Sequence, residues 1–275
     1  MKRIEKKDIE ALYQSLGLAN EEYVVVHSSL LKTGIINNEP VSALPANFYQ
    51  ALTNVMGERG NIFMPAFDYS FPSCREVDLR SQSTSIGVWP EWFRSQAGMI
   101  RSAHPMFSYC GKGPKAKAIC QPDVVEFNSF SSNSTMARLI ENNAMLLLQG
   151  THIGVATIVV QCEAMLGVKY RFLKSFHGDL VLTNGECVSG DYYHFCFPFN
   201  NEYRENYTLL EKRLLSTNKM NKKSLGSGDV YAVKLNDLFI EIKNLLESNP
   251  FALLEHPPQN YYHVENGKEV ATPVL

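Results

Sequence analysis

Three short apolar runs constrain the fold of this chain more than any other feature of its sequence. They span residues 24–26, 61–65 and 144–148. Successive apolar residues are typical of a strand buried on both faces, because a strand with one wet face alternates apolar and polar residues. Each run is preceded by a stretch with apolar residues at helical spacing, and these stretches are residues 5–16, 42–56 and 135–142. The sequence therefore predicts an α/β fold, a three-layer α-β-α sandwich around a mixed sheet.

The second half of the chain predicts elements of both kinds. Residues 172–193 alternate around Asn184-Gly185, which is the strongest short signal for a β-hairpin, so we expect an antiparallel hairpin extension here. Further helices are expected at residues 157–166, 205–215 and 235–248. Further strands are expected near residues 107–110 and 228–233.

Two segments carry no clear pattern. We expect residues 216–227, rich in Lys, Ser and Asn, to form a loop, and the last stretch of the chain, with Pro257, Pro258, Tyr261 and Tyr262, to be irregular. Because no repeat or linker divides the chain, we expect residues 1–275 to form a single domain.

Composition excludes several classes of protein. The chain has 275 residues, 45% hydrophobic and 20% charged, as in an ordinary globular protein, and a net charge of -2 that gives no reason to expect nucleic acid or a membrane as partner. The charged N-terminal segment lacks the apolar core of a signal peptide, and six cysteines without a CxxC pair suggest reduced thiols, so a cytoplasmic protein is expected. The histidines show no HxxH or HExxH spacing, so no metal is expected.

Mostly polar residues follow each apolar run, at the point where the predicted strand ends. These residues are His27, Ser28, Ser29, Leu30, Asp68, Tyr69, Thr151 and His152. In open α/β sheets, ligands bind at the carboxyl ends of the strands. Ser28 and Ser29, with the backbone amides around them, can seat a phosphate or a thioester carbonyl, although such serines also cap helices. Asp68 can hold an amine or a hydroxyl, or can simply be solvated.

The segment between residues 84 and 108 combines an aromatic helical pattern with a polar loop that contains one histidine. Trp89, Trp92 and Phe93 recur at helical spacing and would anchor a short helix to the core. His104 follows in a polar loop, where Pro105 favours an extended backbone at the histidine. From spacing alone, the favoured interpretation is a packed helix followed by a loop whose histidine makes an ordinary hydrogen bond.

Four segments together resemble the antibiotic N-acetyltransferase family, of the aminoglycoside 3-N-acetyltransferase type. The RSxHPxxS segment at residues 101–108, following a G-x-W-P-E-W-F-R helix, carries the resemblance most clearly. The other three segments fall in the family's order at residues 26–30, 60–67 and 150–171. The resemblance covers roughly residues 8 to 178.

The resemblance implies an acyl-CoA-dependent N-acyltransferase, which moves an acyl group from coenzyme A directly to an amine of a sugar. This reaction needs a base for the amine, donors for the thioester oxygen and a slot that aligns the two reactants. By resemblance, the coenzyme A contacts fall on His27, Ser28, Ser29, Leu30, Thr84, Ser85, Gly87, Arg101, Ser102 and Ser108. No metal is implied.

One position departs from the family pattern. The family carries a histidine three residues before a glutamate, whereas this chain has Val160 at that place and retains Glu163. We predict that His152 replaces the missing histidine and pairs with Glu163, which would orient its ring and raise its basicity. The alternative for His152 is a structural loop histidine. We predict His104 as a further catalytic residue beside the thioester, and His177 is the next candidate.

The acceptor is predicted from charge and aromatic content. No acidic run lies near the expected site, while cations and aromatic rings suit a diphosphate and a base, although most of them can equally be solvated cations and core rings. The predicted substrate contacts are Asp68, Tyr69, Lys169, Tyr170 and Arg171.

The leading hypothesis is transfer of an acetyl or 3-hydroxybutyryl group to the amine of a dTDP-linked 3-amino-dideoxy sugar, for bacterial surface polysaccharide. The alternatives are an aminoglycoside 3-N-acetyltransferase and a catalytically inactive protein that binds coenzyme A or sugar. Exposed aromatic residues near the C-terminus would allow a homodimer. The sequence leaves open the acyl chain, the sugar stereochemistry and the position of the amine.

Overall fold

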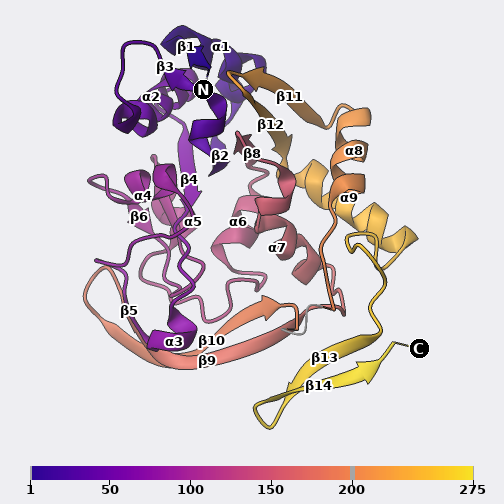
Figure 1. The fold of residues 1–275 in the computed structure, drawn as a ribbon. Coiled ribbons are helices and arrows are strands. Elements are labelled where there is room, and N and C mark those ends of the chain that lie inside the picture. The colour runs from indigo at the N-terminus through magenta and orange to yellow at the C-terminus, as the bar shows by residue number, and fades with distance from the viewer. Residues whose placement is uncertain (1, 199–201, 275) are drawn as a thin grey trace.

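A computed structural model describes residues 2–198 and 202–274. Its centre is a seven-stranded mixed sheet with the strand order β11-β12-β8-β2-β4-β7-β6 (Figure 1). The three strands predicted from apolar runs lie side by side and parallel in the middle of this sheet: β8 (Met145–Gln149), β2 (Tyr23–Ser28) and β4 (Asn61–Pro65). The antiparallel flanking strands are β11 (Met220–Leu225), β12 (Gly228–Lys234), β7 (Tyr109–Lys112) and β6 (Ile100–Arg101).

Helices cover both faces of the sheet, so the predicted three-layer α-β-α sandwich is confirmed. Successive residues of β2 point to opposite faces: Val24 belongs to one apolar core and Val25 to the other. The core around Val24 is closed by α1 (Lys6–Ser15), α2 (Leu44–Met56) and α4 (Val88–Arg94). The core around Val25 is closed by α5 (Ala116–Cys120), α6 (Thr135–Glu141), α7 (Ile158–Met165), α8 (Thr208–Ser216) and α9 (Leu235–Ser248).

Local sequence signals set where the chain turns toward the sheet. The Ser134 hydroxyl accepts a hydrogen bond from the amide of Ala137 at 3.1 Å and caps the start of α6. After α6, Asn143 adopts φ 48°, a left-handed conformation that asparagine tolerates better than most residues. This turn leads directly into β8, the predicted third buried strand.

A second sheet contains the predicted hairpin. β9 (Phe172–Val181) and β10 (Cys187–Cys196) pair along ten residues each, and β5 (Glu76–Asp78) adds a parallel third strand beside β9. The turn forms at Asn184 and Gly185 as predicted, with φ 91° at the glycine. Figure 1 shows this long hairpin sweeping beneath the helices, with α3 (Phe71–Cys74) above it.

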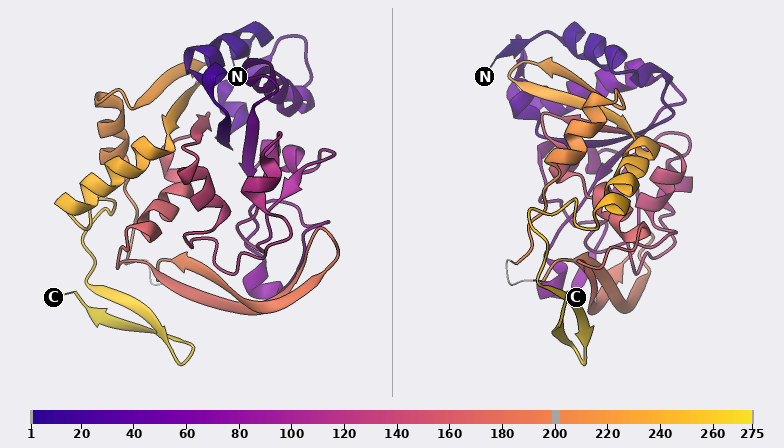
Figure 2. Two further views of the ribbon diagram at one scale, coloured as in Figure 1. Left: turned by 180° about the vertical axis from the view of Figure 1, so that it is seen from behind. Right: turned by 90° about the vertical axis from the view of Figure 1, so that its right-hand side faces the viewer.

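Two predictions of irregular structure are wrong. Residues 216–227 contain β11 rather than a loop, because β12 supplies its hydrogen bonds and only Met220 and Leu225, at its two ends, are buried. The C-terminal stretch forms a hairpin of β13 (Asn260–Glu265) and β14 (Lys268–Pro273), which projects from the body in Figure 2.

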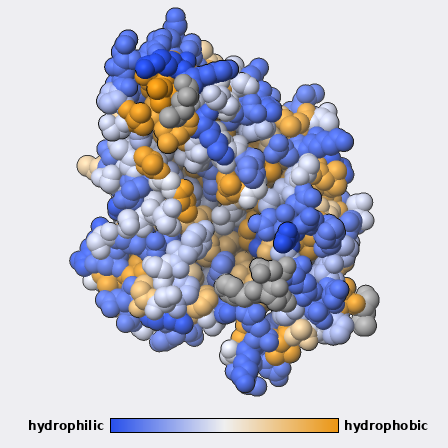
Figure 3. Space-filling model, viewed as in Figure 1, coloured by the Kyte–Doolittle hydropathy of each residue, from blue (hydrophilic) through white to orange (hydrophobic). Residues whose placement is uncertain are grey.

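Short elements complete the described chain. β1 (Arg3–Ile4) pairs with β3 (Ile35–Ile36), and single 3-10 turns occur at Leu18–Asn20, Leu30–Thr33, Val41–Ala43 and Ile153–Val155. Figure 3 shows apolar groups scattered between polar ones on one face of the molecule. Of the helices in the described residues, none combines the length and the apolar character that a membrane crossing requires.

Candidate functional site

Two neighbouring cavities lie at the carboxyl ends of the parallel strands, where the sequence predicts a ligand site. The larger has a volume of about 380 Å³ and is lined by His27, Ser28, Ser29, Lys32, Pro65, Phe67, Tyr69, Ile86, Pro90, Thr151, Val155 and Thr157. The smaller, of about 270 Å³, is lined by Ser28, Ser29, Leu30, Leu31, Val41, Leu44, Pro45, Ile86, Gly87, Val88 and Trp89. The two cavities share Ser28, Ser29 and Ile86, so these residues form their common wall.

The loop after β2 is fixed against the end of β8. The amide of Ser29 donates a hydrogen bond to the carbonyl of Gln149 at 2.8 Å. Gly150 follows with φ 68°, and a Cβ at this position would lie 2.5 Å from the Ser29 carbonyl oxygen. Only glycine meets both conditions without strain, so Gly150 allows the two strand ends to approach closely.

The loop before α4 is fixed against the end of β4. The Thr84 hydroxyl donates to the carbonyl of Phe67 at 2.5 Å, and the Thr84 amide donates to Glu91 at 2.8 Å. Glu91 in turn forms an ion pair with Arg94. These contacts bring Ile86, from the segment 84–87, to the cavity wall.

Besides Thr84, three further predicted coenzyme A contacts are buried and line neither strand-end cavity. Arg101 is 4% exposed and donates five hydrogen bonds, to Ser108, to Gln82 and to backbone carbonyls. The Ser102 hydroxyl accepts from the Tyr109 amide at 2.9 Å, and both Ser102 and Ser108 are buried. Their contacts therefore support a role in shaping the loop around His104, and direct binding of the cofactor by these residues has no support from the geometry.

His104 is fully buried beneath this loop. Its Nδ1 accepts hydrogen bonds from the amides of Met106 and Phe107, each at 3.0 Å, so the ring proton resides on Nε2. Burial, with a smaller effect of His194, lowers the pKa of His104 to about 3. A neutral ring whose acceptor nitrogen is already occupied is poorly suited to the catalytic role predicted for it.

Glu163 forms a buried ion pair with Arg171, for which the sequence holds no local signal. Oε1 accepts from the Tyr170 hydroxyl at 2.7 Å, and Oε2 accepts from Nε of Arg171 at 2.8 Å. Arg171 also lies over the ring of Phe197, at 3.7 Å, and donates to the Tyr207 hydroxyl at 3.3 Å. Burial raises the pKa of Glu163, and the donors Arg171 and Tyr170 offset part of this rise.

The predicted pairing of His152 with Glu163 is therefore corrected to a pairing of Glu163 with Arg171. His152 is exposed, and its Nδ1 accepts from the amide of Gly154 at 3.1 Å. In the described residues no hydrogen bond or ion pair joins His152 to Glu163. His152 instead lines a separate cavity of about 430 Å³ with Tyr207. Its catalytic role stays an untested prediction.

The predicted substrate residues are divided among different places. Tyr69 is half exposed and lines the larger cavity, while Asp68 accepts hydrogen bonds from the amide and hydroxyl of Ser70. Tyr170 and Arg171 belong to the Glu163 cluster, and Lys169 is exposed. Of these five residues, only Tyr69 lines a strand-end cavity.

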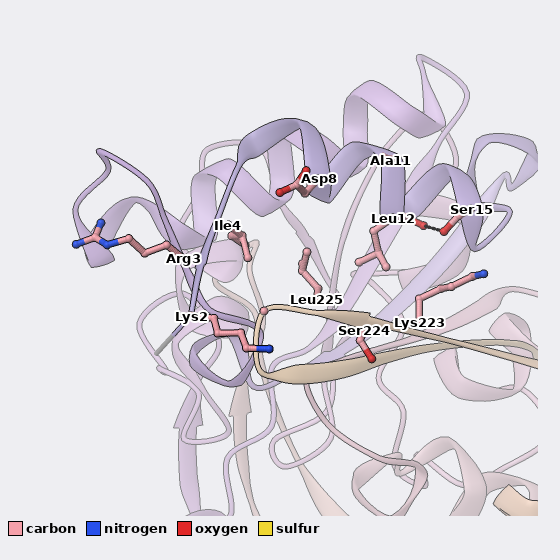
Figure 4. A pocket seen from close by; sticks show the side chains of 11 residues that line it. Lys2, Arg3, Ile4, Asp8, Ala11, Leu12, Ser15, Lys223, Ser224 and Leu225 are labelled. Carbon is pink, nitrogen blue, oxygen red and sulfur yellow. Dashed lines mark hydrogen bonds between the residues drawn. The ribbon is translucent and has the colours of Figure 1, made fainter.

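A further cavity, of about 550 Å³, lies between α1 and β11 (Figure 4). It is lined by Lys2, Arg3, Ile4, Asp8, Ala11, Leu12, Ser15, Lys223, Ser224, Leu225 and Gly226. None of these described residues also lines a strand-end cavity, so this hollow is a separate feature. Residues 2–198 and 202–274 contain no group of three or more His, Cys, Asp or Glu side chains arranged to hold a metal ion.

A mixed sheet between two helical layers defines an α/β protein, and the paired cavities at its strand ends are its candidate site for a small molecule. Residues 25–247 match the family described as aminoglycoside 3-N-acetyltransferase, and the chain belongs to this family. The family part of the resemblance found in the sequence is thereby confirmed.

Two similar proteins are aminoglycoside N(3)-acetyltransferases. Aminoglycoside N(3)-acetyltransferase VII of Streptomyces paromomycinus is 24% identical over 193 residues, which cover 63% of this chain and 65% of that protein. Aminoglycoside N(3)-acetyltransferase IX of Micromonospora chalcea is 24% identical over 192 residues, which cover 63% of this chain and 66% of that protein. The chain thus spans slightly less than two thirds of the length of these relatives.

Solved structures share the fold. The binary complex of AAC-IIIb with CoASH superposes with a TM-score of 0.76 at 17% identity, covering 93% of this chain and 100% of that chain. The apoenzyme of aminoglycoside acetyltransferase AAC(3)-IVa gives a TM-score of 0.71 at 22% identity, covering 93% of both chains. The likeness therefore extends over nearly the whole chain.

Proposed function

We propose that this protein is an acyl-CoA-dependent N-acyltransferase that acylates an amine of an amino sugar, with an aminoglycoside as the first candidate for the acceptor. Membership of the family supports the reaction class, and the names of the relatives support the acceptor. The single observation that carries the proposal is the pair of cavities that meet at Ser28, Ser29 and Ile86.

Two adjoining cavities suit a reaction between two substrates. The amine attacks the thioester carbonyl, so both reactants must occupy neighbouring sites at the same time. The smaller cavity is lined largely by hydrocarbon side chains, among them Leu30, Leu44 and Trp89, and suits the apolar part of an acyl-pantetheine arm. The larger cavity offers hydroxyls and a histidine, and suits the polar acceptor.

A second acceptor is favoured by the charge of the larger cavity. Lys32 is the one charged side chain among its described lining residues, and no carboxylate lies among them. Glu163, a buried acid on α7, does not line this cavity and is paired with Arg171. Such a cavity has no carboxylate among its described lining residues to pair with a polycation, whereas Lys32 can pair with a phosphate. A dTDP-linked amino sugar is therefore the second candidate.

The test is the release of free coenzyme A from acetyl-CoA in the presence of each acceptor. Gentamicin and apramycin represent the first candidate, and a dTDP-linked 3-amino-3,6-dideoxyhexose represents the second. Turnover with only one class assigns the acceptor, and acetylated product is confirmed by mass spectrometry. If coenzyme A binds but neither class of amine is acylated, the protein is a binding protein and the proposed activity is wrong.

A further inference from the structure

His27 occupies a central position in the candidate site. It lies near the carboxyl end of β2, the strand between β8 and β4 in the middle of the sheet. Its backbone pairs with Leu148 of β8, and its side chain lines the larger cavity. The sheet itself therefore fixes this residue, which is more rigid support than a loop provides.

The imidazole of His27 has an unusual environment. Its Nε2 is enclosed and has no hydrogen-bond partner in the described part of the chain. Most buried polar side-chain atoms in proteins have a partner, so a buried histidine without one requires an explanation. Nδ1 is neither enclosed nor hydrogen-bonded among the described residues, so it is the ring nitrogen that a ligand in the cavity can reach.

The other side chains that line this cavity offer no comparable group. They are hydroxyls, hydrocarbon chains, proline rings, an aromatic ring, a phenol and the Lys32 amine. Hydroxyls are weak bases, and a lysine ammonium donates hydrogen bonds but accepts none. Among the described lining residues, His27 alone carries an imidazole.

The remaining candidates for a base are less suitable. Val160 has no titratable group, and Glu163 is paired with Arg171 and Tyr170 and does not line the larger cavity. Nδ1 of His104 is held by two amides inside the loop.

We propose that Nδ1 of His27 accepts the proton of the attacking amine. This inference depends on the proposed N-acyltransferase function. The neutral amine forms a C–N bond to the thioester carbonyl carbon, which gives a tetrahedral intermediate with an ammonium group. The ammonium passes one proton to Nδ1, the C–S bond breaks, and His27 returns the proton to the departing sulfur. The products are the amide and free coenzyme A.

The electrostatic environment fits this role. Burial lowers the pKa of His27 to about 4, so the ring is neutral at pH 7 and its lone pair is available. An imidazolium in this position is unstable, and it readily gives the proton to the departing thiolate. The His27 imidazole thus carries the proton only between the deprotonation of the ammonium group and the departure of the thiolate.

The test compares His27→Asn and His27→Ala with the wild type, and uses His256→Gln, a change at an exposed loop histidine, as the matched control. With acetyl-CoA and the best acceptor, we expect kcat of both His27 variants to fall about 10²- to 10⁴-fold, the usual contribution of a general base. Added imidazole should restore roughly tenfold or more of the loss in His27→Ala, because it can enter the vacated space. KM for acetyl-CoA and calorimetric affinity for coenzyme A should change little, and thermal unfolding reports whether each variant folds.

Each outcome decides a separate question. If the wild type acylates no amine, the proposed function fails and the role of His27 fails with it. If the wild type is active and the Asn variant keeps kcat within about threefold, His27 is not the acceptor. If kcat falls together with affinity for coenzyme A and imidazole restores nothing, His27 positions the cofactor and the proton-transfer role is wrong.

Discussion

Nε of Arg171 lies 2.8 Å from Oε2 of Glu163, and the two side chains are 8% and 0% exposed. The family glutamate is thus neutralised by an arginine eight residues further along the chain. The hydroxyl of Tyr170 takes the other carboxylate oxygen. Each oxygen of Glu163 thus accepts a hydrogen bond from a residue other than a histidine.

The first prediction concerns the stability of this ion pair. Arg171→Met leaves the Glu163 carboxylate buried without its cation, and we expect a loss of about 3–5 kcal/mol in the free energy of unfolding. The double change Glu163→Gln with Arg171→Met should recover most of the loss, because it removes both charges together. Urea unfolding at pH 7 measures both effects.

Arg80→Met is the matched control, since Arg80 forms a similar ion pair with Asp78 at 2.7 Å on the surface. It should leave the free energy of unfolding nearly unchanged. Equal losses in Arg80→Met and Arg171→Met would show that burial adds nothing to the Glu163 pair.

The second prediction concerns acid. The pKa of His104 is about 3 in the folded protein, against about 6.5 for an unfolded histidine. Between about pH 3 and pH 6.5, His104 is protonated in the unfolded chain and neutral in the folded protein. The free energy of unfolding therefore falls as the pH falls below about 6.5. Between pH 7 and pH 5, His104 alone should account for about 2 kcal/mol of lost stability.

His104→Asn tests this effect, because an asparagine side-chain oxygen can still accept from the amides of Met106 and Phe107 but does not titrate. Urea unfolding at pH 7 and pH 5 should show a smaller loss in this variant than in the wild type. His256→Asn, at an exposed site, should keep the full loss. Identical pH dependence in all three proteins would refute the assignment.

The sequence predicts the centre of the fold well, because β2, β4 and β8 each contain a short apolar run that signals burial without any knowledge of the neighbouring strands. Strand ends then locate the cavities, since parallel strands present their carboxyl ends together. The C-terminal stretch is expected to be irregular and instead forms a hairpin, and its Asn266-Gly267 is the same turn signal as Asn184-Gly185.

Side-chain partnerships were harder to predict. The short distance between His152 and Glu163 along the chain suggests a pair. In the structure, however, Nδ1 of His152 accepts a hydrogen bond from the amide of Gly154. Arg171 was assigned to the substrate because a cation next to tyrosines suits a phosphate. Its real partner depends on how the start of β9 returns along α7, and a single sequence holds no local signal for that path.

The third prediction concerns the close approach of two strand ends. Gly17 and Gly150 both have positive φ, at 86° and 68°, but a Cβ at Gly17 meets nothing within 4 Å, whereas at Gly150 it lies 2.5 Å from the Ser29 carbonyl. Gly17→Ala should cost about 1 kcal/mol, the penalty for a left-handed alanine. Gly150→Ala should cost about 3 kcal/mol or more, because backbone displacement adds to the same penalty.

Thermal and urea unfolding compare the two alanine variants directly. Gly150→Ala should also weaken coenzyme A binding, since Ser29 lines both cavities. Similar losses of stability in the two variants would mean that the backbone at Ser29 can move at little cost in free energy. The contact between the loop after β2 and β8 would then not define the cavity wall.

The last prediction concerns the wall between the two cavities. Ile86 lines both of them and is partly exposed, so a larger side chain there can enter the open space without disturbing the core. Ile86→Trp should reduce the affinity for coenzyme A by about tenfold or more, the effect of roughly 1.4 kcal/mol, and leave thermal unfolding unchanged.

Ile240→Trp is the matched control, because Ile240 is 46% exposed on α9 and lines neither cavity. Calorimetry gives the affinities of both variants. An unchanged affinity in Ile86→Trp would mean that coenzyme A binds away from the strand ends, and the two cavities could then no longer be assigned to the two substrates of one transfer reaction.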